Sequence, residues 1–221
     1  MGPRKIKLIT SNHKKTKRNY LGRMNNNKPT IMKISKKYNF HYWDGNRKYG
    51  YGGYKYDGRW KLIAKKLIKK YKLNNKSKIL DVGCGKGFLV YELSKLLNSN
   101  NICGIDISQY AIKNSKKEIK EKLKVFDVRK NFNFKKKEFD LIISINLIHN
   151  FAINEICKFL KKICYFSKSS YITTESYRNE KELFSLQCWA LTCDSFFSTD
   201  EWHWIFKSNG YFRDYELIYF E

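Results

Sequence analysis

The chain has 221 residues, 42% hydrophobic and 16% aromatic, a composition that excludes a disordered protein. No apolar run approaches the roughly 18 residues that a membrane span needs, and no apolar stretch of a secretory signal follows the basic N-terminus, so we expect a cytoplasmic protein without a membrane span. The net charge of +25, from 45 Lys and Arg against 20 Asp and Glu, makes nucleic acid a candidate partner.

The basic charge is concentrated in the N-terminal part of the chain. Residues 1–80 contain 24 Lys and Arg but only two acids, Asp44 and Asp57, whereas the remainder is nearly neutral. Because residues 1–37 have few apolar positions, we expect them to form a flexible, loosely attached basic arm. Such an arm can bind phosphates, an anionic small substrate or a membrane surface, or it can simply be solvated lysine.

Residues 38–75 have a different character. Nine aromatic residues interleaved with glycines lie within residues 38–60, a stretch that we call the aromatic segment. This density requires a packing partner, so we expect an ordered, loop-rich segment that folds over another part of the molecule. Residues 59–72 place Trp60, Ile63 and Leu67 on one face, the pattern of an amphipathic helix on the core.

From residue 78 onward, short apolar strands alternate with amphipathic helices. We predict strands at 78–83, 102–107, 124–128, 139–145, 170–175 and 215–220, and helices at 86–97, 109–122, 152–163, 180–190 and 198–210. The alternation predicts an α/β domain over residues 76–221, with a Rossmann-like, doubly wound and mainly parallel sheet covered by helices on both faces. We expect the last strand to be antiparallel.

The strongest motif is Asp-Val-Gly-Cys-Gly-Lys-Gly at 81–87, which follows a predicted strand and opens a helix. A carboxylate at Asp81 would repel a pyrophosphate but suits an ammonium group. Asp106 ends the next strand, where a carboxylate accepts ribose hydroxyls, and Asp127 ends the third, where an acid can accept the amino group of an adenine. A ligand with an ammonium, a ribose and an adenine but no phosphate fits S-adenosylmethionine. The structural alternative is a glycine turn that only packs helix on sheet, with Asp81 and Asp106 as helix caps.

The sequences ILDVGCGKG, GIDIS and FDLIISINLIHNF resemble successive motifs of the class I S-adenosylmethionine-dependent methyltransferases, over residues 78–175. The resemblance implies S-adenosylmethionine as the cofactor. It also implies a set of cofactor-binding residues: Gly83, Cys84, Gly85 and Gly87 beside the methionine part, Asp81 near the cofactor, Asp106 on the ribose, Ile107, Asp127 and Val128 around the adenine, and Asn146 facing the methyl group.

The residues after the fourth strand bear on the acceptor. They lack the proline motif of amine-methylating nucleic-acid enzymes and the Pro-Cys of cytosine-C5 enzymes, and Leu147-Ile148-His149-Asn150 resembles the Leu-His-His type of small-molecule methyltransferases. His149 is then the candidate catalytic base, or else a histidine that binds backbone at a helix start.

Three residues are candidates for binding the acceptor. Arg59 and Tyr54 belong to the aromatic segment, which holds the place of a lid in class I enzymes, and Arg59 suits a carboxylate or a phosphate. Glu175 ends a predicted strand, where it contacts substrate or pairs with Arg178.

The favoured function is methylation of a small-molecule acceptor on oxygen or nitrogen. The alternatives are an RNA methyltransferase that uses the basic arm, or a cofactor-binding module without transfer activity. The six cysteines include no C-x-x-C pair, and the sequence predicts no metal site and no oligomeric state.

Overall fold

The computed structural model describes residues 2–9, 18–131 and 134–221. Its strands form one sheet in the order β1-β7-β6-β5-β2-β3-β4, and every strand pair in the described part is parallel. The strands are β1 (Arg4–Lys5), β2 (Ile79–Val82), β3 (Ile102–Asp106), β4 (Leu123–Val125), β5 (Phe139–Ile145), β6 (Ser167–Glu175) and β7 (Asp214–Ile218).

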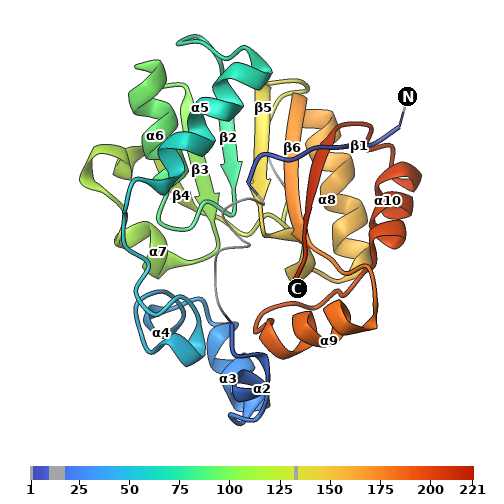
Figure 1. Ribbon diagram of the computed structural model, residues 1–221. Coiled ribbons are helices and arrows are strands. Elements are labelled where there is room, and N and C mark those ends of the chain that lie inside the picture. Colours follow the sequence, from blue (N-terminus) through green and yellow to red (C-terminus); the bar gives the residue numbers. More distant parts are fainter. Residues whose placement is uncertain (1, 10–17, 132–133) are drawn as a thin grey trace.

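Helices cover both faces of the sheet and the edge where its strands end. They are α2 (Tyr20–Met24), α3 (Lys28–Ser35), α4 (Phe40–Trp43), α5 (Arg59–Tyr71), α6 (Phe88–Leu97), α7 (Gln109–Lys113), α8 (Ile153–Phe166), α9 (Glu180–Trp189) and α10 (Thr199–Ser208). Figure 1 shows the strands running toward α2, α3, α4 and α9, which lie below their carboxyl ends. The predicted doubly wound α/β fold is confirmed.

The last strand differs from the expectation, because β7 runs parallel to β6, with Tyr171 beside Asp214 and Glu175 beside Ile218. The antiparallel prediction is wrong. Its physical reason lies in the connection: the chain leaves β6 and returns through α9 and α10. A crossover of this length brings it back to the starting edge of the sheet, so β7 enters in the same direction as β6.

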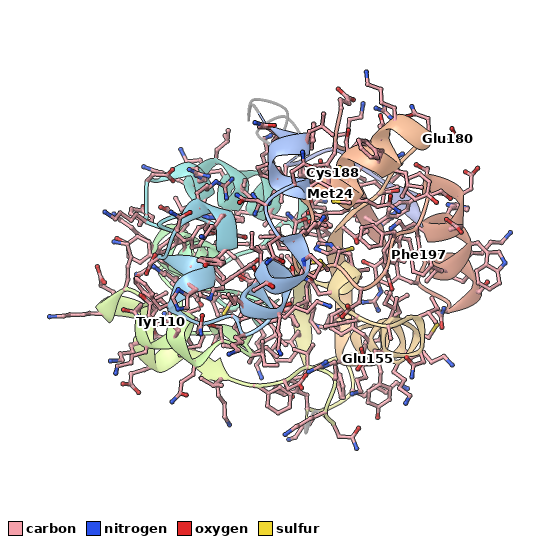
Figure 2. The ribbon with its side chains drawn as sticks, turned by 90° about the horizontal axis from the view of Figure 1, so that it is seen from below. Met24, Tyr110, Glu155, Glu180, Cys188 and Phe197 are labelled. Carbon is pink, nitrogen blue, oxygen red and sulfur yellow. The ribbon has the colours of Figure 1, made fainter. Side chains whose placement is uncertain are left out.

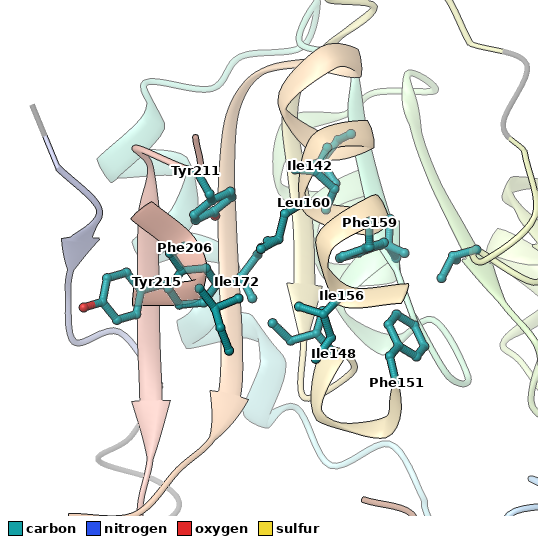
Figure 3. Close-up of a cluster of buried hydrophobic side chains, with 14 of the residues drawn as sticks. Ile142, Ile148, Phe151, Ile156, Phe159, Leu160, Ile172, Phe206, Tyr211 and Tyr215 are labelled. Carbon is teal, nitrogen blue, oxygen red and sulfur yellow. The ribbon is translucent and has the colours of Figure 1, made fainter. Parts of the chain in front are cut away.

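Two apolar layers hold the sheet between helices. On one face, Ile142 and Ile172 pack with residues of α8 and α10 such as Leu160 and Phe206 (Figure 3). On the other face, Leu141 and Ile143 pack with the apolar side of α5 and α6. Because neighbouring residues of a strand point to opposite faces, the continuous run 141–143 supplies both layers.

The predicted helix at 109–122 is broken in the structure. It ends as α7 at Lys113, and Lys117–Lys122 form a separate 3-10 helix. Asn114 lies at the break, where its side-chain amide donates a 2.8 Å hydrogen bond to the Tyr110 carbonyl. This side-chain bond takes a carbonyl at the end of α7 and favours termination of the helix.

The described parts of the expected flexible arm are packed against the domain. Arg4–Lys5 add a strand to the edge of the sheet, and the carboxylate of Glu216 accepts a 2.7 Å hydrogen bond from the amide of Leu8. Tyr20 of α2 meets Trp189 of α9 edge-on, and Met24 and Cys188 of the same two helices lie together in Figure 2. Residues 10–17 of the arm lie outside the described residues.

No helix within the described ranges is long and apolar enough to cross a membrane. The six cysteines are free thiols.

The packing of α5 on the sheet gives a direct test of the core. Leu67 is fully buried on this helix, whereas Leu62 is 54% exposed on the same helix. Leu67→Ala removes buried methyl groups and leaves a cavity, so it should lower the free energy of unfolding by about 3 kcal/mol. Leu62→Ala, the matched control, should change it by less than about 0.5 kcal/mol. Urea unfolding measures both, and equal losses would contradict this packing.

Candidate active site

A cavity of about 370 Å³ lies at the carboxyl ends of the strands. We call residues 83–87, which follow β2, the glycine loop. Residues 83–85 of this loop and the ends of β5 and β6 form the floor of the cavity. The aromatic segment, α9 and the N-terminal residues Arg18 and Arg23 form the opposite wall. This is the edge at which open α/β sheets bind ligands, and the volume lies in the roughly 300–1,000 Å³ range of small-molecule pockets.

The glycine loop is shaped by hydrogen bonds to the neighbouring strand. The amides of Gly83 and Cys84 both donate to the Ile105 carbonyl, at 2.8 and 3.1 Å. Gly85 has a φ of +57°, and its amide donates a 2.8 Å hydrogen bond to the Asp106 carboxylate. The left-handed backbone favours glycine at this position and turns its amide toward that acid.

Trp43 lies directly on this loop. A Cβ added to Gly85 would stand 2.7 Å from Cη2 of Trp43, so only glycine leaves room for the ring. The indole N–H donates a 2.9 Å hydrogen bond to the hydroxyl of Ser108, and the ring stacks on Tyr51 at an interplanar angle of 7°. Gly85 and Ser108 are the two residues whose amides bind the Asp106 carboxylate. Trp43 therefore covers the site of Asp106.

An ion pair beside Trp43 attaches the aromatic segment to the glycine loop. Lys86 of the loop donates to both oxygens of Asp44 at 2.7 Å, and its side chain is 7% exposed. Tyr110 and the amide of Tyr54 donate to the same carboxylate at 2.8 and 3.0 Å. Desolvation opposes ionisation of Asp44, but the hydrogen bonds from Lys86 and Tyr110 outweigh it and lower its pKa.

Asp81 is a buried acid, and none of the described residues donates a hydrogen bond to its carboxyl group. It lines the cavity, and its desolvation, together with the nearby charge of Asp106, raises its pKa to about 7. A carboxyl group in this state lacks a cationic or hydrogen-bonding partner. A bound ammonium group would supply one.

His149 and Glu175 form a second polar pair in the cavity. The amide of Glu175 donates to Nδ1 of His149 over 3.4 Å, and Nε2 of the imidazole stands 3.8 Å from the Glu175 carboxylate. Burial lowers the pKa of His149, and the charge of Glu175 opposes this shift, so the imidazole is neutral at pH 7. Arg178 does not pair with Glu175, because its guanidinium binds Glu182 and Glu221.

Asn146 follows β5 with a φ of +54°, a left-handed conformation that Asn tolerates. Its side-chain oxygen accepts a 2.8 Å hydrogen bond from the hydroxyl of Thr173. This bond orients the amide of Asn146 at the wall of the cavity.

Nine of the residues predicted from the sequence line this cavity. They are Asp81, Gly83, Cys84, Gly85, Asn146, His149, Tyr54, Arg59 and Glu175.

The other five predicted residues, Gly87 among them, do not line the cavity. A Cβ on Gly87 would lie 2.6 Å from Leu123, so this glycine lets helix and strand approach closely. Asp106 is turned toward the loop amides, Ile107 is 44% exposed, and Asp127 binds the Arg129 guanidinium. The fifth residue, Val128, is buried in the core.

Sequence reasoning missed Trp43 as the residue that meets Gly85, and it missed Arg23, Arg47 and Trp189 as cavity residues. The aromatic density of residues 38–60 signalled a packed segment but not its partner. Lys86, within the glycine loop, is the sequence feature that could have indicated an acidic partner for this loop.

A family model described as a methyltransferase domain matches residues 73–210. A chain from the complex between the Haloferax volcanii Trm112 methyltransferase activator and a methyltransferase has 19% identity and a TM-score of 0.54, over 66% of both chains. The YcgJ protein from Bacillus subtilis has 16% identity and a TM-score of 0.53, also over 66% of both.

The MccD protein has 22% identity and a TM-score of 0.51, over 66% of this chain and 68% of that one. At these identities the likeness shows the fold. The alignments with the first two structures span slightly under two thirds of those chains. A search of curated proteins found no match.

The Asp44–Lys86 pair provides a test of how the aromatic segment is attached. Asp44→Asn leaves the Lys86 ammonium buried without a counter-charge, so the free energy of unfolding should fall by about 2–3 kcal/mol. Asp57→Asn is the matched control, because Asp57 pairs with Arg59 at the surface of the same segment, where the loss should stay below about 1 kcal/mol. Chemical unfolding distinguishes the two, and an undiminished stability of Asp44→Asn would show that the pair does not fasten the segment.

Proposed function

This chain belongs to the class I S-adenosylmethionine-dependent methyltransferases, and on that premise we propose that it methylates an oxygen or nitrogen atom of a small-molecule acceptor. One observation carries the proposal: the N-terminal part of the chain closes a cavity of small-molecule size over the glycine loop. The basic residues that suggested RNA binding are partly used in this closure. Arg18, Arg23 and Arg47 line the cavity.

The residues of the cavity floor fit the cofactor, which supplies a methyl group on a sulfonium. Asp81 would accept the ammonium of its methionine part, since this carboxyl has no hydrogen-bond partner among the described residues. The amides of the glycine loop lie beside it. Asp106 remains the predicted ribose residue, but Trp43 covers it, so contact with a ribose requires the indole ring to move. Ile107, Asp127 and Val128 remain predictions for the adenine.

The His149–Glu175 pair supports a route for the acceptor's proton. When a hydroxyl is methylated, the bond from its oxygen to the methyl carbon forms as the carbon–sulfur bond breaks, and the hydroxyl proton leaves the acceptor. A protonated amine must lose a proton before its nitrogen has the lone pair that forms the new bond. Because the amide of Glu175 donates to Nδ1 of His149, the neutral imidazole carries its hydrogen on Nε2, facing the carboxylate. Glu175 would then receive the proton, and His149 would orient and stabilise the carboxylate. This replaces the simpler proposal of His149 as the base.

The ionisation of Asp81 gives a pH test of cofactor binding. Its pKa near 7 means that the carboxylate, the form that attracts an ammonium, is about one tenth populated at pH 6 and about nine tenths at pH 8. The affinity for S-adenosylhomocysteine should therefore rise roughly tenfold from pH 6 to pH 8. Asp81→Asn should bind more weakly and lose this dependence. Calorimetry at both pH values measures it, and an unchanged pH dependence in the variant would remove Asp81 from the site.

The proton route is tested with two substitutions in the pair. Glu175→Gln keeps the shape of the side chain but cannot accept a proton, so turnover should fall by about 10²-fold or more while S-adenosylhomocysteine affinity stays within twofold. His149→Ala should reduce turnover less, by about tenfold, because it only loosens the carboxylate. The reverse order of the two losses would return the role of base to His149.

The acceptor class is tested with methyl-labelled S-adenosylmethionine and an extract of the source cells separated into RNA, protein and small-molecule fractions. We expect label in the small-molecule fraction. Label in RNA would contradict the proposal and favour the RNA methyltransferase. Cofactor binding without label in any fraction would favour a binding module.

A further inference from the structure

The indole of Trp189 is surrounded by arginines at the wall of the cavity opposite the glycine loop. The guanidinium carbon of Arg23 lies 4.2 Å from the ring centroid, that of Arg47 at 5.4 Å and that of Arg18 at 5.5 Å. These are cation–π distances, and all four residues line the cavity. We call Arg23, Arg47 and Trp189 the arginine pole.

Within the described part of the chain, no carboxylate forms a direct ion pair with the arginine pole, although the charge of Glu175 acts on Arg23 from elsewhere in the cavity. Among the described residues, no Asp or Glu oxygen lies within 4.0 Å of the guanidinium of Arg23 or Arg47, and Nε of Arg23 is buried without a hydrogen-bond partner. Other arginines are paired: Arg59 with Asp57, and Arg129 with Asp127. A buried donor without an acceptor is unfavourable, and so is the mutual repulsion of cations gathered around one ring; a bound anion would relieve both.

The electrostatics of Arg23 agree with this geometry. Desolvation and the neighbouring charge of Arg47 lower its pKa to about 10, so it remains cationic at neutral pH. Like charges held together in a partly buried cavity are typical of a binding site rather than of structural ion pairing.

We propose, on the basis of the proposed function, that the arginine pole binds an anionic group of the acceptor, a phosphate or a carboxylate. A guanidinium fork matches either group with two parallel hydrogen bonds, and the unpaired Nε–H of Arg23 supplies one such donor. Glu175, in the same cavity, repels an anion. The acceptor is therefore oriented with its anionic end at the arginine pole and its nucleophilic end toward Glu175.

The test uses binding, which does not depend on turnover. Phenyl phosphate and benzoate are titrated by calorimetry into the full chain saturated with S-adenosylhomocysteine. We expect one of them to bind, and the stronger ligand identifies the anionic group as phosphate or carboxylate. In the double variant Arg23→Gln/Arg47→Gln this affinity should fall at least about tenfold.

The matched control is Lys33→Gln/Lys37→Gln, which removes two charges from exposed positions of the same N-terminal part and should leave the affinity unchanged. Arg47→Gln alone is a milder variant, because it removes one charge at an exposed position and leaves Arg23 in place. It should show part of the loss.

Three results would overturn the inference: no binding of either probe to the unaltered chain, equal affinity in the double variant, or a loss of S-adenosylhomocysteine affinity in that variant. The last would mean that the arginines serve the cofactor. Failure of the proposed function has a different signature. A chain that binds a probe through the arginine pole but binds no S-adenosylhomocysteine refutes methyl transfer and leaves the anion site standing.

Discussion

The contact between Trp43 and Gly85, with the Asp44–Lys86 ion pair beside it, is the constraint on which the rest of the site depends. Without the aromatic segment, the glycine loop and the strand ends would be exposed to solvent. The indole of Trp43 packs against the loop because Gly85 has no side chain. Lys86 of the loop is neutralised by Asp44 of the aromatic segment. Together these two contacts hold the N-terminal part of the chain over the strand ends, and this turns the edge into a partly open cavity.

Charge is distributed unevenly around that cavity. Asp81 lies on the floor beside the glycine loop, and the His149–Glu175 pair lies near the end of β6. The arginine pole lies on α2, on the 3-10 helix Arg47–Tyr49 and on α9. The first two regions carry negative charge and suit a cationic cofactor and a departing proton. The third carries positive charge and suits an anion. A ligand pair with complementary charges would be held in one orientation, which is what methyl transfer by proximity requires.

The sequence predicted best where local pattern and fold coincide. The strand before Asp81, the glycine loop and the alternation of strands and helices were correct because buried parallel strands and left-handed glycines leave strong local signals. It failed where long-range packing decides. It did not predict that the oxygens of Asp106, which has the expected position at the end of β3, accept hydrogen bonds from the amides of Gly85 and Ser108. The direction of β7 depended on the crossover through α10. The packing of Arg18 and Arg23 on α9 depended on Trp189, a partner at the other end of the chain.

The measurement that tests this closure most directly is native-state hydrogen exchange of the aromatic segment in the chain without ligand. The amides of Tyr51, Gly53 and Tyr54 bond to the carbonyls of Tyr42 and Trp43 within the docked segment. Their exchange should be at least about 10²-fold slower than in an unstructured peptide, since opening them requires undocking from Gly85 and Lys86. Exchange at the unstructured rate, with the strands still protected, would show that the segment does not close the site.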